Sequence, residues 1–462
     1  MSTEPPPHEN EPLPNATSVS RGHPWIAWCV IVGVATLVIW RHGQPDRREK
    51  RFIENRLLSV ISDWQARYLV GAAKLFPDKE SQQFADAAAV DSGPMDQRLR
   101  GVVVVGEISG PKAAAEKLDA VQRAKKDEAA TEQDRETIDA LVRLYDDLKK
   151  EKPTLPSLKP DDRQRITDQL GWSGQLALHP AGGGDAAGRD ALLEEARRTI
   201  TSSLLVFAAL GALTLAGLAA LATVLVLLAI RPQARALRPQ TSHGGIYAET
   251  FAVWIALYVA LSYAAAFLPV GQNRLPLTIA VMLASLTALA WPRLRGVPWS
   301  TVRDDVGLRF GRRPVVELLL GPVCYISALP LVVVGVLIIA ALMALERKLT
   351  GNAGGEFSQQ IPSHPIVGWL LEASWWEKLQ IVILASVMAP LVEETMFRGV
   401  LYRHLRDATA RFGYAASVLA SSLAVSFVFA AIHPQGWIGV PVLMGLALAF
   451  NLAREWRGTL LP

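Results

Sequence analysis

The chain has 462 residues, of which 50% are apolar and 19% are charged, and its formal net charge is +4. A positive mean hydropathy at this length indicates a membrane protein and excludes a largely disordered chain. The only two cysteines, Cys29 and Cys324, exclude a disulfide framework and a cysteine-rich zinc site. The arginines lie beside apolar runs, which is typical of membrane proteins rather than of nucleic-acid-binding proteins.

The N-terminal part divides into three predicted segments. Residues 1–24 are rich in Pro, Glu and Asn, which predicts a disordered N-terminus. Residues 25–40 form an apolar run with a tryptophan at each end, which predicts an uncleaved membrane anchor helix. Residues 41–199 are rich in Ala and charged residues, with helical periodicity over 111–124 and 131–152. We expect an extramembrane helical domain there, either a packed spacer or a module that binds a protein partner.

Seven further apolar runs are each about long enough to cross a bilayer. These runs are Ser203–Ile230, Phe251–Val270, Leu275–Trp291, Leu318–Leu345, Ile381–Val400, Tyr414–Ile432 and Ile438–Ala453. The pattern predicts an all-α fold: a polytopic membrane helical bundle of about eight transmembrane helices with an inserted extramembrane helical domain. Residues 200–315 are expected to hold transmembrane helices and a basic cytoplasmic loop.

The short loops that carry arginines predict the orientation. They are 231–249, 292–314, 398–413 and the segment after residue 453, and they share one side if the eight spans alternate. We therefore expect a multi-pass inner-membrane or plasma-membrane protein with a cytoplasmic N-terminus and with 41–199 outside. A basic cluster after residue 40 argues against this, and 41–199 would be cytoplasmic if 25–40 is not a span. His404, between two arginines, is expected to be solvated.

Three charged residues stand inside one apolar run, where charge is costly and is typical of functional sites. Arg398 follows Glu394 by four positions, so these two side chains share a helix face, whereas Glu393 points elsewhere. This spacing lets one carboxylate pair with the arginine while the other acts as a base towards water. Alone, the Glu394–Arg398 pair would also be explained as a structural ion pair.

A histidine ends the next apolar run. Phe429 and His433 are four positions apart, and Pro434 ends or kinks the helix directly afterwards. A histidine in this place could hold a water, donate to an oxyanion or bind a metal, although a single interfacial histidine is also common. The glutamates, the arginine and the histidine together favour catalysis or ion handling.

The pattern Glu393-Glu394-x-x-x-Arg398, followed about 30 residues later by Phe429-x-x-x-His433, resembles the first two motifs of a known family. This is the CPBP family of CAAX-processing and bacteriocin-processing intramembrane endopeptidases, also called the Abi family. The resemblance covers roughly 316–462 and implies proteolysis within the membrane. It does not reach 41–199.

The resemblance also implies roles for single residues. Glu393 would activate the attacking water, Glu394 and Arg398 would support the site, and His433 would hold the water or stabilise the oxyanion. Phe397 and Phe429 would form the wall of the site against the substrate. The cofactor is left open, because Glu393, Glu394 and His433 could supply three ligands to a divalent metal such as zinc. They could equally perform acid–base chemistry without metal.

The family has a third motif, a histidine followed four positions later by Asn or Asp on one more helix. The sequence has no histidine after His433 and ends at Pro462. Asn451 lies on the preceding run and is not assigned the missing role. We expect either a fragment, with 316–462 lacking its last helix, or a pseudoenzyme.

The leading hypothesis is an intramembrane endopeptidase that cleaves a membrane-associated peptide or protein. The expected partners are the lipid bilayer, this substrate and a protein partner for 41–199, with no nucleic acid. The alternative is a non-catalytic scaffold or immunity-type binding protein acting through 41–199. A transporter with Glu393 and His433 as a proton relay ranks below both, because no inverted repeat is visible.

Overall fold

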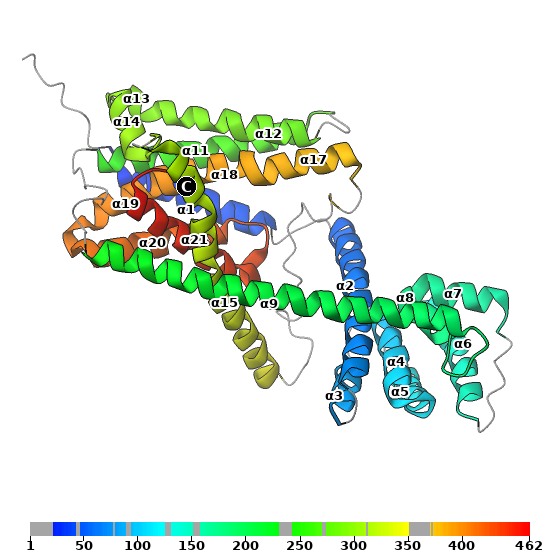
Figure 1. Cartoon of the computed structure of the whole chain (residues 1–462). Helices are drawn as coiled ribbons and strands as arrows, with labels where there is room; N and C mark the ends of the chain where they lie inside the picture. Colours follow the sequence, from blue (N-terminus) through cyan, green and yellow to red (C-terminus); the bar gives the residue numbers. More distant parts are fainter. Residues whose placement is uncertain are drawn as a thin grey trace, which may run out of the picture. The chain divides into compact units, whose positions relative to one another are not determined.

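The computed structural model describes most of the chain, and nothing is said below of the remainder. The described residues are 22–42, 47–76, 79–88, 94–124, 131–150, 158–230, 243–269, 274–310, 313–350, 370 and 373–462. All regular elements in these ranges are helices (Figure 1), which confirms the all-α prediction. The disorder predicted for 1–24 falls almost wholly outside the described residues; Pro24 already begins a helix.

Eight helices are long and apolar enough to cross a membrane, which confirms the predicted number within the described ranges. These candidate spans are Pro24–Arg41, Ala186–Ile230, Gly245–Ala266, Arg274–Leu294, Pro314–Glu346, Trp375–Phe412, Tyr414–Ala431 and Gly436–Arg457. Their length and apolar composition indicate an integral membrane helical bundle.

The chain forms two compact units. The first, called the bundle unit, comprises Met1–Gln44, Leu213–Ala341 and Pro362–Pro462. The second, called the inserted unit, comprises Pro45–Ala212 and Leu342–Ile361. Each unit is described by itself.

Seven helices, the first part of an eighth and the end of α15 (Pro314–Thr350) build the inserted unit. Apart from α15, they are α2 (Arg47–Leu75), α3 (Lys79–Ala88), α4 (Met95–Ser109), α5 (Pro111–Ala124), α6 (Glu132–Leu148), α7 (Pro160–Leu170), α8 (Trp172–Leu178) and the first part of α9 (Ala186–Ile230). Helix α6 begins at a capping box in which Thr131 and Asp134 satisfy each other's backbone N–H groups. Helix α7 begins at Pro160, where a proline costs no hydrogen bond.

The inserted unit has its own apolar core around α4. Val102, Val103 and Val104 are each at most 1% exposed, and they belong to a cluster with residues of α2, α5, α6 and α8. Within this core, burial and then the charge of Glu107 raise the pKa of the Tyr145 phenol. This apolar core gives the inserted unit a fixed structure, although the unit has many charged residues.

Helix α9 runs without interruption through the predicted boundary at residue 199/200. Its first half packs in the inserted unit through Leu192 and Ala196, and its apolar second half, from Leu213, belongs to the bundle unit. The predicted span therefore begins inside a longer helix, because no proline interrupts the segment between the two halves.

Helices α1 and α11 to α21, with parts of α9 and α15, build the bundle unit. Their bounds are α1 (Pro24–His42), α11 (Gly244–Ala266), α12 (Arg274–Ser285), η3 (Leu286–Ala290), α13 (Trp291–Leu294), α14 (Trp299–Val306), α15 (Pro314–Thr350), α17 (Trp375–Ile383), η4 (Leu384–Met388), α18 (Ala389–Glu393), η5 (Glu394–Leu401), α19 (Tyr402–Thr409), η6 (Ala410–Phe412), α20 (Tyr414–Ala431) and α21 (Gly436–Arg457). Helix α11 contacts α1, α12, α19 and η5, so the glutamate-bearing segment packs on it.

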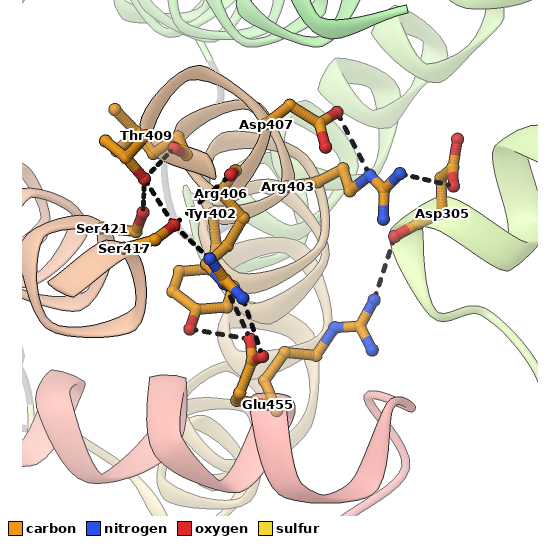
Figure 2. Close-up of polar contacts among 11 residues, drawn as sticks. Asp305, Tyr402, Arg403, Arg406, Asp407, Thr409, Ser417, Ser421 and Glu455 are labelled. Atoms are coloured by element: carbon orange, nitrogen blue, oxygen red, sulfur yellow. Dashed lines mark hydrogen bonds and ion pairs between the residues drawn. The ribbon is translucent and has the colours of Figure 1, made fainter. Parts of the chain in front are cut away.

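A buried ionic cluster joins α14, α19, α20 and α21 (Figure 2). Arg403 Nη2 lies 3.3 Å from Asp305 Oδ1, and its Nε lies 3.4 Å from Asp407 Oδ2. Arg406 makes two contacts of 3.1 Å with the Glu455 carboxylate. These arginines belong to segments that the sequence analysis assigned to cytoplasmic loops, and yet both are 2% exposed.

The expectation that His404 is solvated is wrong. The ring is 4% exposed and its Nε2 accepts a hydrogen bond of 3.1 Å from Trp28 Nε1 of α1. The reason is that α19 is packed on several sides, and acidic partners compensate the arginines next to His404, which lets the whole helix be buried.

Candidate active site

The two glutamates lie in one long helical run from Trp375 to Thr409. The run begins at a capping box formed by Ser374 and Glu377. It changes twice to π-helix, at η4 and η5. Pro390, at the start of α18, lacks the N–H for a helical hydrogen bond, and a wider turn before it relieves that mismatch. The second π-helix begins at Glu394 and includes Arg398, and Glu393 is the last residue of α18.

Glu394 and Arg398 form an ion pair, as their spacing predicted. Arg398 Nη1 lies 3.1 Å from Glu394 Oε1, and the arginine side chain is only 1% exposed. The guanidinium also lies over the ring of Phe429, 4.5 Å from its centroid, and 5.6 Å from that of Phe450. One carboxylate and two aromatic faces thus compensate the buried charge.

Glu393 points away from this pair and meets the histidine. His433 Nε2 lies 4.0 Å from Glu393 Oε1, and their side chains are 16% and 28% exposed. In the sequence, Glu393 stands inside its apolar run whereas His433 ends the next run, so their proximity needs an explanation. Each lies 20 positions from Gly413, the turn between η6 and α20, so two antiparallel helices of equal length bring them to the same level.

The hydrogen bonding of His433 determines which ring atom faces the glutamate. Its Nδ1 is 2.5 Å from the carbonyl oxygen of Phe429, which can only accept, so Nδ1 donates. In the neutral ring, Nε2 is then an acceptor that faces a second acceptor, Glu393. The 4.0 Å separation is too long for a direct hydrogen bond, and one water can contact both groups by donating to each.

Phe397 and Phe429 lie behind the charged groups. Phe397 is 1% exposed and Phe429 is 5% exposed. Their ring centroids are 5.1 Å apart in an edge-to-face arrangement, and the Phe429 ring is 4.1 Å from that of His433. These contacts fix the histidine relative to the glutamate helix, so the two phenylalanines form a packed back wall.

The donors that the sequence analysis named for a metal do not form a three-ligand set. No group of three His, Cys, Asp or Glu side chains among the described residues is arranged to hold a metal ion. Glu393 and His433 face each other, whereas Glu394 Oε1 is turned towards Arg398. Of the three predicted ligands, two therefore face each other, and the third is paired with an arginine.

Asn451, to which the sequence analysis gave no role, is buried. Its Nδ2 donates to the backbone oxygen of Ser422 and to Ser426 Oγ, each at 3.1 Å. The asparagine therefore joins α21 to α20.

The sequence analysis missed the contribution of α11 to the wall. Phe251 and Trp254 lie 5.2 and 5.6 Å from the Phe397 ring. These residues were counted as ordinary apolar residues of a span. Their spacing with Tyr247 and Tyr258, one aromatic at every turn of a helix, was the available signal.

Residues 374–462 match the family model described as type II CAAX prenyl endopeptidase Rce1-like. No curated protein and no solved structure matches the chain. The matched segment includes all six residues named for the site, whereas α11 and the aspartate of α14 lie outside it.

Proposed function

Residues 374–462 match the family model of type II CAAX prenyl endopeptidases, Rce1-like, and from this match we propose that the protein is an intramembrane endopeptidase. Its substrate is a membrane-associated peptide or protein, with an apolar or lipid-bearing segment that enters between the spans. The observation that supports the proposal is the distance of 4.0 Å between Glu393 Oε1 and His433 Nε2.

In the proposed reaction, a water between Glu393 and His433 attacks the scissile carbonyl. Glu393 accepts the proton of the water as it attacks and returns it to the leaving amine, so the peptide bond is exchanged for a carboxylate and an amine. Arg398 holds Glu394 and stabilises the π-helix that directly follows Glu393. His433, held through Nδ1 by its own helix, orients the water.

The central test is Glu393→Gln in the full chain, reconstituted in lipid. We expect cleavage to fall about 100- to 10,000-fold, since general-base catalysis contributes a factor of that size. A farnesylated peptide with a CAAX end and an unmodified membrane-anchored peptide serve as substrates. Adding a metal chelator to the unaltered protein separates a metal-dependent reaction from one of the glutamate type.

The control is Glu377→Gln, a glutamate of the same helical run that lies at its capping box. Full cleavage by that variant and by Glu393→Gln would refute the proposed mechanism. Loss in both would indicate a folding defect, which thermal unfolding of the purified proteins would show.

A second function is supported by the exposed face of α2. Val60, Ile61 and Trp64 are 56%, 42% and 43% exposed, although all three are apolar. Such a patch is typical of protein interaction sites. A scaffold acting through the inserted unit would lose its partner on Trp64→Glu, measured by cross-linking, and would tolerate Glu393→Gln.

We also propose the orientation given by the positive-inside rule: the N-terminus and the segment 292–314 are cytoplasmic, and the inserted unit is outside. The exposed arginines Arg293 and Arg303 support this assignment.

A further inference from the structure

A short segment with α13 and α14 joins two candidate spans of the bundle unit. The first span ends at Leu294 and the second begins at Pro314, so both ends of the segment lie at the same surface of the bilayer. Within it, α13 and α14 contact each other (Figure 1). The segment lies outside the residues that match the family model.

One face of α14 is fixed to the bundle. Val302 and Val306 are 0% exposed, and Asp305 is 5% exposed. Asp305 Oδ2 accepts a hydrogen bond of 2.7 Å from the Tyr247 hydroxyl, and its backbone oxygen accepts one of 2.9 Å from Arg454 Nη2. These contacts hold the segment at the end of the spans, so its opposite face lies at the level of the lipid headgroups.

The opposite face carries an excess of positive charge. Arg293, Arg303 and Arg309 are exposed, and so is one carboxylate, that of Asp304, which lies 3.8 Å from Arg309. No ion pair joins Arg293 or Arg303 to a carboxylate within the part of the chain that the structure describes. These two guanidinium groups are therefore available to an anion from outside the chain.

Large apolar side chains lie among these arginines. Leu294 and Phe310 are 76% and 74% exposed, and Trp299 is 44% exposed. Trp299 and Arg303 are four positions apart on α14, so they share its outer face. A fixed face that combines arginines with tryptophan, leucine and phenylalanine is typical of elements that lie at the boundary between headgroups and acyl chains.

We propose that this face, called the headgroup face, binds acidic phospholipids of the surrounding bilayer. Its arginines contact the lipid phosphates, and its apolar side chains enter the adjoining acyl region. The face consists of Arg293, Leu294, Trp299, Arg303, Arg309 and Phe310.

The position of the headgroup face favours lipid over a soluble acidic protein. A soluble partner would match the charge as well, but the apolar side chains lie next to the ends of two spans, where acyl chains are adjacent. Each arginine at such a surface strengthens the attraction to acidic lipid by a factor of about five. The inference goes beyond the proposed function and does not depend on cleavage.

The test compares Arg293→Gln/Arg303→Gln with Arg135→Gln/Arg163→Gln in the full chain. Arg135 and Arg163 are exposed on α6 and α7 of the inserted unit, so both double variants remove two charges from exposed positions. Each protein is placed in nanodiscs with equal parts of phosphatidylglycerol and phosphatidylcholine, and native mass spectrometry counts the retained lipids. We expect the unaltered chain and the control to prefer phosphatidylglycerol at least about threefold, and the Arg293/Arg303 variant to lose at least about half of this preference.

Thermal unfolding separates lipid binding from folding. A ligand that binds the folded protein stabilises it, so phosphatidylglycerol should raise the unfolding midpoint of the unaltered chain above its value in phosphatidylcholine alone. Arg293→Gln/Arg303→Gln should lose at least half of this increase and keep the midpoint in phosphatidylcholine. Arg293→Lys/Arg303→Lys should restore the increase, because the attraction depends on charge.

A fluorescent probe tests the apolar part of the headgroup face. The probe is attached to a cysteine at Phe310 or at Gln133, an exposed position of α6, in a chain whose two natural cysteines are replaced. We expect a doxyl group on the lipid acyl chain to quench the probe at Phe310 at least twofold more strongly than the probe at Gln133. Quenching at Phe310 by dissolved iodide alone would place the face in water and overturn the inference.

Equal lipid preference and equal midpoint increases in the two glutamine double variants would also overturn the inference. If Arg293→Gln/Arg303→Gln already unfolds earlier in phosphatidylcholine, the lysine variant decides. A lysine variant that keeps the preference for phosphatidylglycerol supports binding through charge, and one that loses it assigns the arginines to folding only.

Discussion

Individual side chains at the site are each held by several contacts of different kinds. Arg398 pairs with Glu394 on its own helix and lies over Phe429 of α20. Phe429 in turn contacts His433, and its backbone oxygen holds the histidine ring. Arg398 thus links the two helices of the hairpin. A side chain of the same charge but a different shape should therefore lower the stability of the protein.

We therefore expect Arg398→Lys to destabilise the protein by about 1–2 kcal/mol. A lysine keeps the charge and loses the planar group that covers the Phe429 ring and fits the carboxylate. The matched control is Arg411→Lys, since Arg411 also covers a ring, that of Phe412, at an exposed position. Thermal unfolding in detergent measures both, and equal midpoints would contradict the prediction.

At the scale of helices, close packing depends on glycines and on buried ion pairs. Gly217 of α9 lies against the backbone of α15 near Ile326, where an added Cβ would collide with a carbonyl oxygen. Gly211, two turns earlier in the same helix, has open space around it. A comparison of these two glycines therefore separates the effect of packing on stability from the effect of helix propensity.

Gly217→Ala should destabilise the bundle unit by about 1–3 kcal/mol, the cost of overpacking. Gly211→Ala should stabilise its helix by up to about 1 kcal/mol, because alanine favours helix more than glycine does. The unfolding midpoints of the two variants, measured side by side, should therefore move in opposite directions. A stabilised Gly217→Ala would show that α9 and α15 are not in close contact.

The buried ion pair between α19 and α21 leads to a prediction about the cost of leaving a buried charge without its partner. Glu455 is 0% exposed and compensates Arg406, while the Tyr402 hydroxyl donates to it at 3.0 Å. Glu455→Gln leaves the arginine buried without a countercharge and should cost about 3–5 kcal/mol. Glu194→Gln breaks the exposed pair with Arg198 and should cost at most about 1 kcal/mol. Similar losses in the two variants, by chemical denaturation, would contradict the structural role of the cluster.

At the scale of the whole molecule, the orientation of the chain in the membrane determines which partners the inserted unit can contact. In a chain whose two cysteines are replaced, a cysteine at Gly182 should react with an impermeant maleimide in intact cells. A cysteine at Ser300, an exposed position of α14, should react only after permeabilisation. The reverse pattern would place the inserted unit in the cytoplasm and remove the first span from the topology.

The sequence by itself determined what depends on neighbours along the chain. Apolar length predicted the spans, and the four-residue spacing predicted the Glu394–Arg398 pair, because helix geometry relates such positions directly. The equal distances of Glu393 and His433 from Gly413 were also present in the sequence, although only an antiparallel hairpin turns them into a contact.

Only the tertiary structure decided which charged residues are buried and which distant helix completes the site. Arg403 and Arg406 look like loop charges, and Asp305 and Glu455, which compensate them, come from elements up to about 100 positions away. Phe251 and Trp254 likewise reach Phe397 through the packing of α11 on the glutamate helix. Burial of a charge depends on the partner brought to it in space, and sequence spacing carries no information about that partner.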